Sequence, residues 1–267
     1  MIDLHFHILP GLDDGPETIE ESVDLARAAA EAGTTLVAAT PHVRADHPFD
    51  LARIDTGVHE LNRALETAGV ALEVVAGGEV AITELTELDR SVLRGVCLND
   101  GPYVLVESPY TEVGPLLERT LFDAQLAGLR PVLAHPERSP CFLEDLDRLS
   151  EMVSRGVLSS ITAGSMAGRF GRTVRELTVR LFERRLVHNV ASDAHSLQGR
   201  PPGLGGGFDA LEEELPGLSE QAAWYTHHAP AAMLSGEKLP PPPAALRRRT
   251  TRGRQLAGRM HAAFGRR

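Results

Sequence analysis

The sequence predicts an α/β protein in which parallel strands close into a barrel. Seven short runs rich in Val, Leu, Ile and Thr alternate with stretches of helical periodicity, as repeated strand–helix units do. The runs are mostly continuously apolar, which is typical of strands that are buried on both faces. The chain of 267 residues is long enough for one such barrel or for two smaller domains.

The seven expected strands lie within the first 192 residues. They are Ile2–His5, Thr35–Thr40, Leu72–Ala76, Tyr103–Glu107, Pro131–Ala134, Val157–Thr162 and Val187–Ser192. An open, doubly wound sheet could use the same alternation, but no phosphate-binding Gly-x-Gly-x-x-Gly follows the first run. We therefore predict a closed barrel that forms a single domain over residues 1–236.

Helices are expected between these strands. Residues 19–30 place apolar side chains at helical spacing, and Gly33 stands where a C-terminal cap belongs. Residues 142–153 and 174–181 repeat the pattern. One or two further helices are expected after the glycine-rich run 203–207.

Residues 237–267 are expected to form a Pro-rich linker and an Arg-rich tail. Four prolines follow Leu239 and interrupt regular structure. From Pro240 onward there are eight arginines and no acidic residue. We expect this segment to be disordered. The alternative is a tether to an anionic membrane surface or to an acidic partner.

Charge and composition exclude several classes of protein. The net charge is −10, and the 239 residues before the tail hold 19 basic and 37 acidic side chains, a balance of −18. Such an acidic body argues against nucleic-acid binding. No apolar run approaches the roughly 20 residues that span a bilayer, and the first residues do not resemble a signal peptide. With only two cysteines, Cys97 and Cys141, we expect a cytoplasmic protein.

Chemically active side chains follow six of the seven expected strands. The C-terminal ends of barrel strands meet on one face, where such enzymes place their active sites. Any one of these residues alone would be read as packed or solvated, but their shared register indicates a metal cluster. The candidates are His5, His7, Asp13, Asp14, His42, Glu79, Glu107, His135, Asp193 and His195.

Five histidines and four carboxylates, with one of the adjacent Asp13 and Asp14 counted, are too many for one ion, because a catalytic zinc takes about three protein ligands and water. They suit two or three ions with open positions. A mixed imidazole and carboxylate set without thiolate favours Mn²⁺, Fe or Zn²⁺ over Ca²⁺ or Mg²⁺. Neighbouring ions activate water and stabilise an in-line displacement, which suits phosphate-ester hydrolysis.

Two arginines are candidates for binding the phosphate. Arg138 follows His135 by three residues, and Arg200 follows His195 by five. The planar guanidinium can bind two phosphate oxygens at once. For each arginine the alternative is a solvated cation on a loop.

A metal-dependent amidohydrolase is the rival prediction, since it would also begin with His-x-His on the first strand. Many of these enzymes bridge two metals with a carboxylated lysine. The only lysine here, Lys238, lies after the last expected strand. Glu79 can bridge instead, which favours a phosphoesterase.

Four motifs resemble those of the polymerase and histidinol phosphatase (PHP) superfamily. They are Asp3-Leu4-His5-Phe6-His7, Thr40-Pro41-His42, His135-Pro136-Glu137-Arg138 and Ser192-Asp193-Ala194-His195. The longer strings 5–15 and 162–171 resemble bacterial manganese-dependent protein-tyrosine phosphatases that are encoded with capsule and exopolysaccharide genes. The resemblance covers about residues 1–236.

The resemblance implies a distorted seven-stranded TIM-like barrel, the PHP fold, with a trinuclear metal site. Glu79 would bridge ions, Arg138 and Arg200 would hold the phosphate of phosphotyrosine, and a metal-activated hydroxide would attack phosphorus directly. Asp14 is preferred over Asp13 on the motif match alone. The implied ligands are His5, His7, Asp14, His42, Glu79, Glu107, His135, Asp193 and His195.

The substrate that the resemblance implies is the tyrosine-rich tail of an autophosphorylating kinase that controls polysaccharide polymerisation. Two alternatives stay open. One is a small-molecule phosphatase that acts on histidinol phosphate or a sugar phosphate. The other is a non-catalytic metal-binding partner of a kinase.

Overall fold

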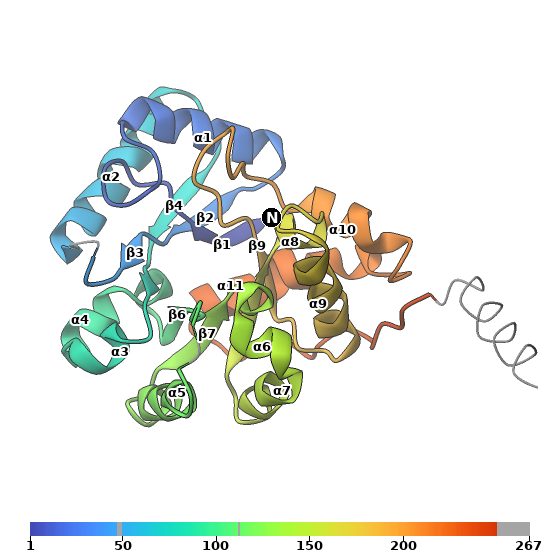
Figure 1. The fold of residues 1–267 in the computed structure, drawn as a ribbon. Coiled ribbons are helices and arrows are strands. Elements are labelled where there is room, and N and C mark those ends of the chain that lie inside the picture. Colours follow the sequence, from blue (N-terminus) through green and yellow to red (C-terminus); the bar gives the residue numbers. More distant parts are fainter. Residues whose placement is uncertain (47–49, 112, 250–267) are drawn as a thin grey trace, which may run out of the picture.

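A computed structural model describes residues 1–46, 50–111 and 113–249 of the protein (Figure 1). All of its strand pairs are parallel. One group pairs in the order β1 (Ile2–Phe6), β2 (Leu36–Ala39), β4 (Glu73–Ala76). The other pairs in the order β3 (His42–Val43), β5 (Glu79–Val80), β6 (Tyr103–Glu107), β7 (Arg130–Ala134), β8 (Leu158–Thr162), β9 (Asn189–Ala191).

The two groups form one barrel, because two of its strands are each broken in the middle. β2 continues into β3 after the segment 40–41, and β4 continues into β5 after the segment 77–78. Gly78 is required at its break, since a Cβ there would lie 2.9 Å from a methyl carbon of Val43 and 3.0 Å from Cβ of Val96. The nine short strands therefore occupy seven barrel positions.

Hydrogen bonds between the last strand and the first close the barrel. The N–H of Asp193 donates to the carbonyl of His5, and the N–H of His7 donates to the carbonyl of Ala194, both at 2.9 Å. The predicted parallel α/β barrel is thus confirmed. The ends of the expected strands agree with the observed ones within two residues; the last, for example, shortens from 187–192 to 189–191.

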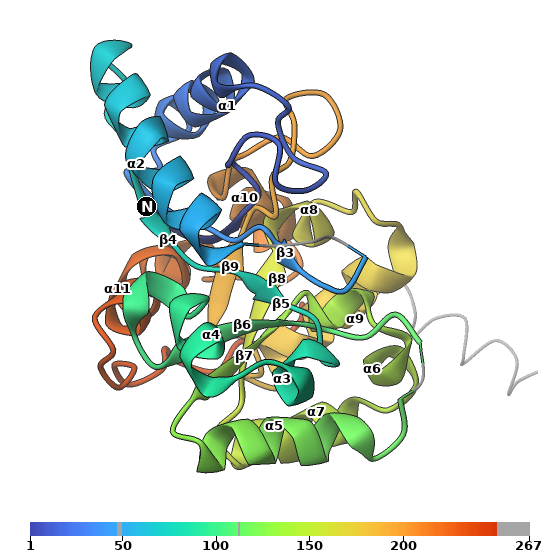
Figure 2. The same cartoon turned by 90° about the vertical axis from the view of Figure 1, so that its left-hand side faces the viewer.

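Helices surround the strands, and Figure 2 shows α1 and α2 on one side of them and α5 and α7 on the opposite side. Short 3₁₀ turns lie at 98–100, 136–138 and 219–221, and a π-helical turn lies at 224–228. The α-helices are α1 (Ile19–Glu31), α2 (Leu51–Thr67), α3 (Glu84–Glu87), α4 (Arg90–Gly95), α5 (Leu116–Leu126), α6 (Pro140–Glu144), α7 (Leu146–Ser154), α8 (Ala163–Met166), α9 (Arg172–Glu183), α10 (Gly205–Glu212) and α11 (Ala229–Leu234).

Local sequence explains where the longer helices begin and end. The side chains of Thr18, Asp50 and Asp145 accept N–H groups from the first turns of α1, α2 and α7. After α1 the predicted cap, Gly33, has the left-handed φ of +89°. The apolar faces of these helices pack on the strands, and all five residues of β6 are buried, as expected of a strand covered on both faces.

Residues 237–249, the C-terminal strap, have no regular secondary structure. Leu246 is only 7 % exposed, and the indole N–H of Trp224 donates to the carbonyl of Pro241 at 2.9 Å. The strap, which includes the predicted Pro-rich linker, is thus packed, whereas the disorder predicted for the Arg-rich tail mostly concerns residues outside the described ranges. The apolar contact of Leu246 and the hydrogen bonds to the backbone offset the entropy that ordering it costs.

The domain boundary after residue 236 stays a prediction. Most of the predicted Arg-rich tail, residues 250–267, lies outside the described residues. Within the described ranges, no helix combines the length and the apolar character that crossing a bilayer requires.

Candidate metal centre

The nine residues predicted as metal ligands meet at the C-terminal ends of the barrel strands. They form four overlapping groups, and within each group one ligand atom per residue lies within 4.8 Å of the others. Sharing of residues between groups makes this a single cluster. The groups are His7, Asp14, His42 and His195; His5, His7 and Asp193; His5, Glu79 and His135; and His42, Glu79 and Glu107.

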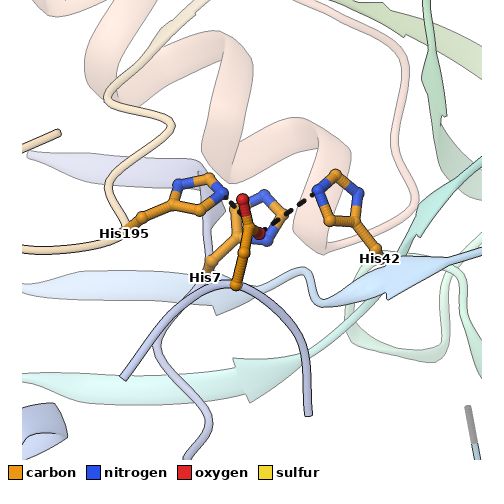
Figure 3. A group of neighbouring side chains, drawn as sticks. His7, His42 and His195 are labelled. Carbon is orange, nitrogen blue, oxygen red and sulfur yellow. Dashed lines mark ion pairs between the residues drawn. The ribbon is translucent and has the colours of Figure 1, made fainter. Parts of the chain in front are cut away.

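Residues far apart in the chain supply one side of the cluster. Figure 3 shows the rings of His7, His42 and His195 gathered together, each from a different segment. The ring of His7 stacks on that of His195 with 3.8 Å between centroids and lies 4.6 Å from that of His42. Three imidazoles this close favour a shared cation over mutual packing alone.

Glu79 is the central carboxylate and is almost completely buried. Its Oε1 lies 2.8 Å from Nε2 of His135. Its Oε2 lies 3.0 Å from Nδ1 of His42, 3.3 Å from Nε2 of His5 and 3.4 Å from Nε2 of His7. One carboxylate thus faces four imidazoles with its two oxygens, which is the placement that a bridging ligand needs.

The adjacent residues Asp13 and Asp14 have different surroundings. Asp13 lies 2.6 Å from Nδ1 of His7 and accepts the backbone N–H of His42 at 3.0 Å. Burial would raise the pKa of Asp13, but the hydrogen bond to His7, the charge of His7 and the backbone N–H groups of Gly15 and His42 together lower it to about 2. The ionised carboxylate can only accept, so Nδ1 of His7 carries the proton and Nε2 is left for an ion.

Asp14 faces the cluster directly. Its Oδ1 lies 3.1 Å from Nε2 of His195 and 3.5 Å from Nε2 of His42. The geometry therefore supports the choice of Asp14 as the ligand. The orienting role of Asp13 was missed, because the motif match indicates which of the two aspartates is a ligand but not what the other one contacts.

Two turns that carry ligands have strained backbones. His135 and Asp193, each just after a strand, have φ values of +36° and +54°, a region that non-glycine residues rarely adopt. Buried Asp3 supports the second turn by accepting the N–H of Ser192 at 3.1 Å and that of His5 at 3.2 Å. Burial raises the pKa of Asp3 to about 6 against the opposing hydrogen bonds.

The sixth expected strand ends without a ligand, as predicted, and it has a supporting role instead. Glu137 is fully buried. Its Oε1 accepts from the N–H and hydroxyl of Thr162, at 2.9 and 2.8 Å, and from the hydroxyl of Ser165, at 2.7 Å. This network holds the turn between His135 and Arg138 in place. Sequence reasoning missed Glu137, although the motif contains it.

Both predicted arginines reach the cluster. Nη2 of Arg138 donates to Asp193 Oδ2 at 2.7 Å, and the guanidinium lies 4.8 Å over the ring of Phe170. Nη2 of Arg200 donates to Asp14 Oδ2 at 2.9 Å, and its Nη1 lies 3.4 Å from Asp193 Oδ2.

A third arginine at the cluster was not predicted. Nη1 of Arg44 donates to Oε1 of Glu107 at 3.2 Å, and its other side pairs with Asp46. Its position two residues after His42 is the only sequence signal that could have indicated it.

The electrostatics of the cluster favour added cations. Burial would lower the pKa of His7 and of His42, but hydrogen bonds to Asp13 and Glu79 raise it to about 9 for His7, and bonds to Asp14 and Glu79 raise it to about 10 for His42. Burial alone would raise the pKa of Glu79, yet the charge of His5 and the hydrogen bonds of His135 and His42 hold it well below its ordinary value.

The donor atoms fit divalent ions. Oε2 of Glu79 and Nε2 of His195 are buried and face Nδ1 of His42 at 3.0 Å and Oδ1 of Asp14 at 3.1 Å, but neither atom has a well-aligned hydrogen bond within the described part of the chain. Buried lone pairs on carboxylate and imidazole that point at one another need a cation between them. The donor set suits Mn²⁺, Fe or Zn²⁺.

Residues 1–225 match the family model for capsular polysaccharide synthesis, CpsB/CapC. The chain belongs to the CpsB/CapC family. It is 39 % identical over 204 residues to the tyrosine-protein phosphatase YwqE of Bacillus subtilis, covering 75 % of this chain and 79 % of that protein. It is 29 % identical over 219 residues to the tyrosine-protein phosphatase CpsB of Streptococcus agalactiae, covering 76 % and 86 %.

Solved structures agree with this membership. A chain from the crystal structures of YwqE from Bacillus subtilis and CpsB from Streptococcus pneumoniae, which are metal-dependent tyrosine phosphatases, matches with a TM-score of 0.81 and 34 % identity. The match covers 91 % of this chain and 99 % of that one. A β-aspartyl dipeptidase from Fervidobacterium islandicum matches with a TM-score of 0.55 at 16 % identity, which concerns the fold alone.

Proposed function

We propose that this CpsB/CapC family member is a metal-dependent protein-tyrosine phosphatase. The observation that carries the proposal is the cluster of five histidines and four carboxylates around Glu79, with the guanidiniums of Arg138 and Arg200 at its edge. Its relatives YwqE and CpsB are tyrosine-protein phosphatases, which supports the same chemistry here.

The cluster would hold two or three divalent ions, with Mn²⁺ as our first choice and Fe or Zn²⁺ as alternatives. Bound ions would supply Lewis acidity and an activated water at neutral pH. Glu79 would bridge ions, because its two oxygens face histidines on both sides. Asp13 would hold a proton of His7 on Nδ1 and fix the orientation of the ring, so that Nε2 is the nitrogen that faces an ion.

Arg138 and Arg200 would bind the phosphate of the substrate. Nε of Arg138 is buried and has no hydrogen-bond partner among the described residues. A guanidinium has five N–H groups in a fixed fork, so the carboxylates that now pair with it leave donors for phosphate oxygens. These donors would neutralise charge on the phosphate without a cysteine nucleophile; both cysteines, Cys97 and Cys141, are buried away from the cluster's ligand groups.

The protein substrate would be the tyrosine kinase that regulates capsule or exopolysaccharide synthesis, and the enzyme would act in the cytoplasm. The capsular polysaccharide description of the family supports this choice of partner. Contact of the Arg-rich tail with an anionic membrane or an acidic partner is part of the proposal and concerns residues outside the described ranges.

The test compares hydrolysis of a phosphotyrosyl peptide with that of histidinol phosphate, in Mn²⁺ and then in EDTA. We expect EDTA-sensitive hydrolysis that strongly prefers the peptide. A preference for histidinol phosphate would make the protein a small-molecule phosphatase with the same metal chemistry. Bound metal without hydrolysis of either substrate would favour the non-catalytic alternative.

A further inference from the structure

An exposed aromatic side chain stands beside the metal centre. Tyr110 is 51 % exposed, although it follows β6 by only three residues and β6 ends at the candidate ligand Glu107. Its ring stacks on that of His135 with 5.7 Å between centroids and 25° between planes. The ring therefore covers a candidate ligand on one face, while much of the side chain faces solvent.

The segment that carries Tyr110 is held on both sides. The hydroxyl of Ser139 donates to the carbonyl of Pro109 at 2.6 Å, and this bond is buried. The thiol of Cys141 lies 3.5 Å from the carbonyl of Thr111 and donates to it. The neighbours of Tyr110 on either side are thus tied to the start of α6, so the ring has a defined position at the mouth of the site.

A second aromatic ring near the proposed phosphate-binding arginines, that of Phe170, is covered by a guanidinium. The guanidinium of Arg138 covers Phe170 at 4.8 Å. The ring of Tyr110 is exposed instead, and the positive charge of Arg138 is close enough to act on its hydroxyl. A phosphate held by Arg138 and the ions would leave its ester group directed toward the mouth, next to this ring.

We propose that the ring of Tyr110 forms one wall of the substrate site and selects phosphate esters of aryl alcohols over those of alkyl alcohols. The inference rests on the proposed phosphatase function and names the residue that gives it a preference for phosphotyrosine. An aromatic wall favours an aryl group because two rings pack in offset or edge-to-face geometry, beyond the contact that an alkyl group makes.

The first experiment measures kcat/KM for phenyl phosphate and for glycerol 2-phosphate with the Mn²⁺-loaded protein. Tyr110→Ala should lower the ratio of the two values roughly 3- to 10-fold, the size of one aromatic pair. Tyr110→Phe should keep the ratio, because it keeps the ring. Phe122→Ala on α5 is the matched control, since Phe122 is equally exposed, at 54 %, and lies on another element.

A binding measurement gives an answer that does not depend on turnover. The affinities for phenylphosphonate and methylphosphonate, titrated into metal-loaded protein, should show the same 3- to 10-fold loss of preference in Tyr110→Ala, by roughly the strength of one aromatic pair. A wild type that binds both phosphonates equally, or a variant that loses affinity for both alike, would overturn the inference.

Measuring the metal content of the variants distinguishes a structural role of Tyr110, as a cover for His135, from a role in substrate selection. If Tyr110→Ala loses metal, Tyr110→Leu keeps apolar bulk over His135 and removes only the ring. Unchanged selectivity in Tyr110→Leu would also overturn the inference. If the proposed function is wrong, the wild-type protein will not hydrolyse a phosphotyrosyl peptide. The binding preference between the two phosphonates would still decide the role of Tyr110.

Discussion

The metal centre and the C-terminal strap both bring opposite charges together, with different consequences. In the metal centre the carboxylates and imidazoles are nearly all buried, and the pKa values of several are shifted far from their ordinary range. In the strap, Arg248 pairs with Glu176 and Glu214, and its side chain is 36 % exposed. Water solvates the charges of the strap pair, whereas the buried charges of the metal centre must be compensated by other groups inside the protein.

The two arrangements of charge have different roles. Arg248 balances nearby carboxylates on the surface, where an ion pair contributes little. The metal centre brings four carboxylates together with five histidines. The buried Oε2 of Glu79 and Nε2 of His195 are left without a well-aligned hydrogen bond in the described part of the chain. Such a cluster is costly unless cations complete it. Substitutions in each region test this difference.

The largest effect is expected when a ligand of the metal centre is removed. His42→Ala or Asp193→Ala should lower kcat/KM for a phosphotyrosyl peptide by more than about 10³-fold, because the ions that activate water are lost. Metal content by elemental analysis should fall in parallel. His59→Ala is the control, because His59 lies exposed on α2. A ligand variant with full metal content and normal kinetics would contradict the assignment.

Removing a phosphate-binding arginine should have a smaller effect and leave the ions in place. Arg138→Ala should lower kcat/KM about 10- to 100-fold, the strength of a charge-assisted hydrogen bond to phosphate. Elemental analysis should show unchanged metal. Normal kinetics across substrates would show that Arg138 only supports Asp193.

Changing pH should affect the metal-free and the metal-loaded protein in opposite ways. The pKa values of His7 and His42 are raised to about 9 and 10 from an ordinary 6.5. Protonation of these residues therefore stabilises the metal-free fold fully below pH 6.5, and this contribution is lost as pH rises through 9 and 10.

The melting temperature in EDTA should accordingly fall between pH 7 and pH 10. Metal ions compete with protons for the same nitrogens, so the increase in melting temperature caused by Mn²⁺ should grow between about pH 6.5 and 8.5. Thermal unfolding with and without metal measures both trends. A metal-induced increase that is independent of pH would show that these imidazoles are not ligands.

The smallest effect is expected in the strap. Arg248→Ala should lower the free energy of unfolding by less than about 1 kcal/mol, because the pair that it removes is exposed. Metal content and kcat/KM should not change. Chemical denaturation of the wild type and of Arg248→Ala measures this difference in the free energy of unfolding. A loss of several kcal/mol would mean that the strap pair contributes as much as a buried interaction.

Much of the architecture could be predicted from local sequence. Strands that are buried on both faces need continuous apolar runs, and seven such runs were visible. The ligand candidates stood out because each followed a run at the same point, and the structure brings all nine together. The family resemblance in the opening string then indicated the chemistry, and the family match agrees with it.

Features that depend on distant contacts could not be predicted. Breaks at 40–41 and 77–78 divide two strands, and at the second break Gly78 passes close to Val43 and Val96. Packing of the strap depends on Trp224 and on the burial of Leu246, although its prolines alone resemble a disordered linker.

The sequence by itself determined the order of strands and helices and the identity of the residues that carry chemistry, since periodicity and residue type are properties of short segments. Only the tertiary structure decided that Asp13 orients His7 while Asp14 faces His195, and that the ring of Tyr110 lies over His135. The physical reason is that hydrogen-bond geometry and ring stacking act over a few ångströms. Those distances are set by strand pairings that close the barrel between residues far apart in the chain, such as His5 and Asp193.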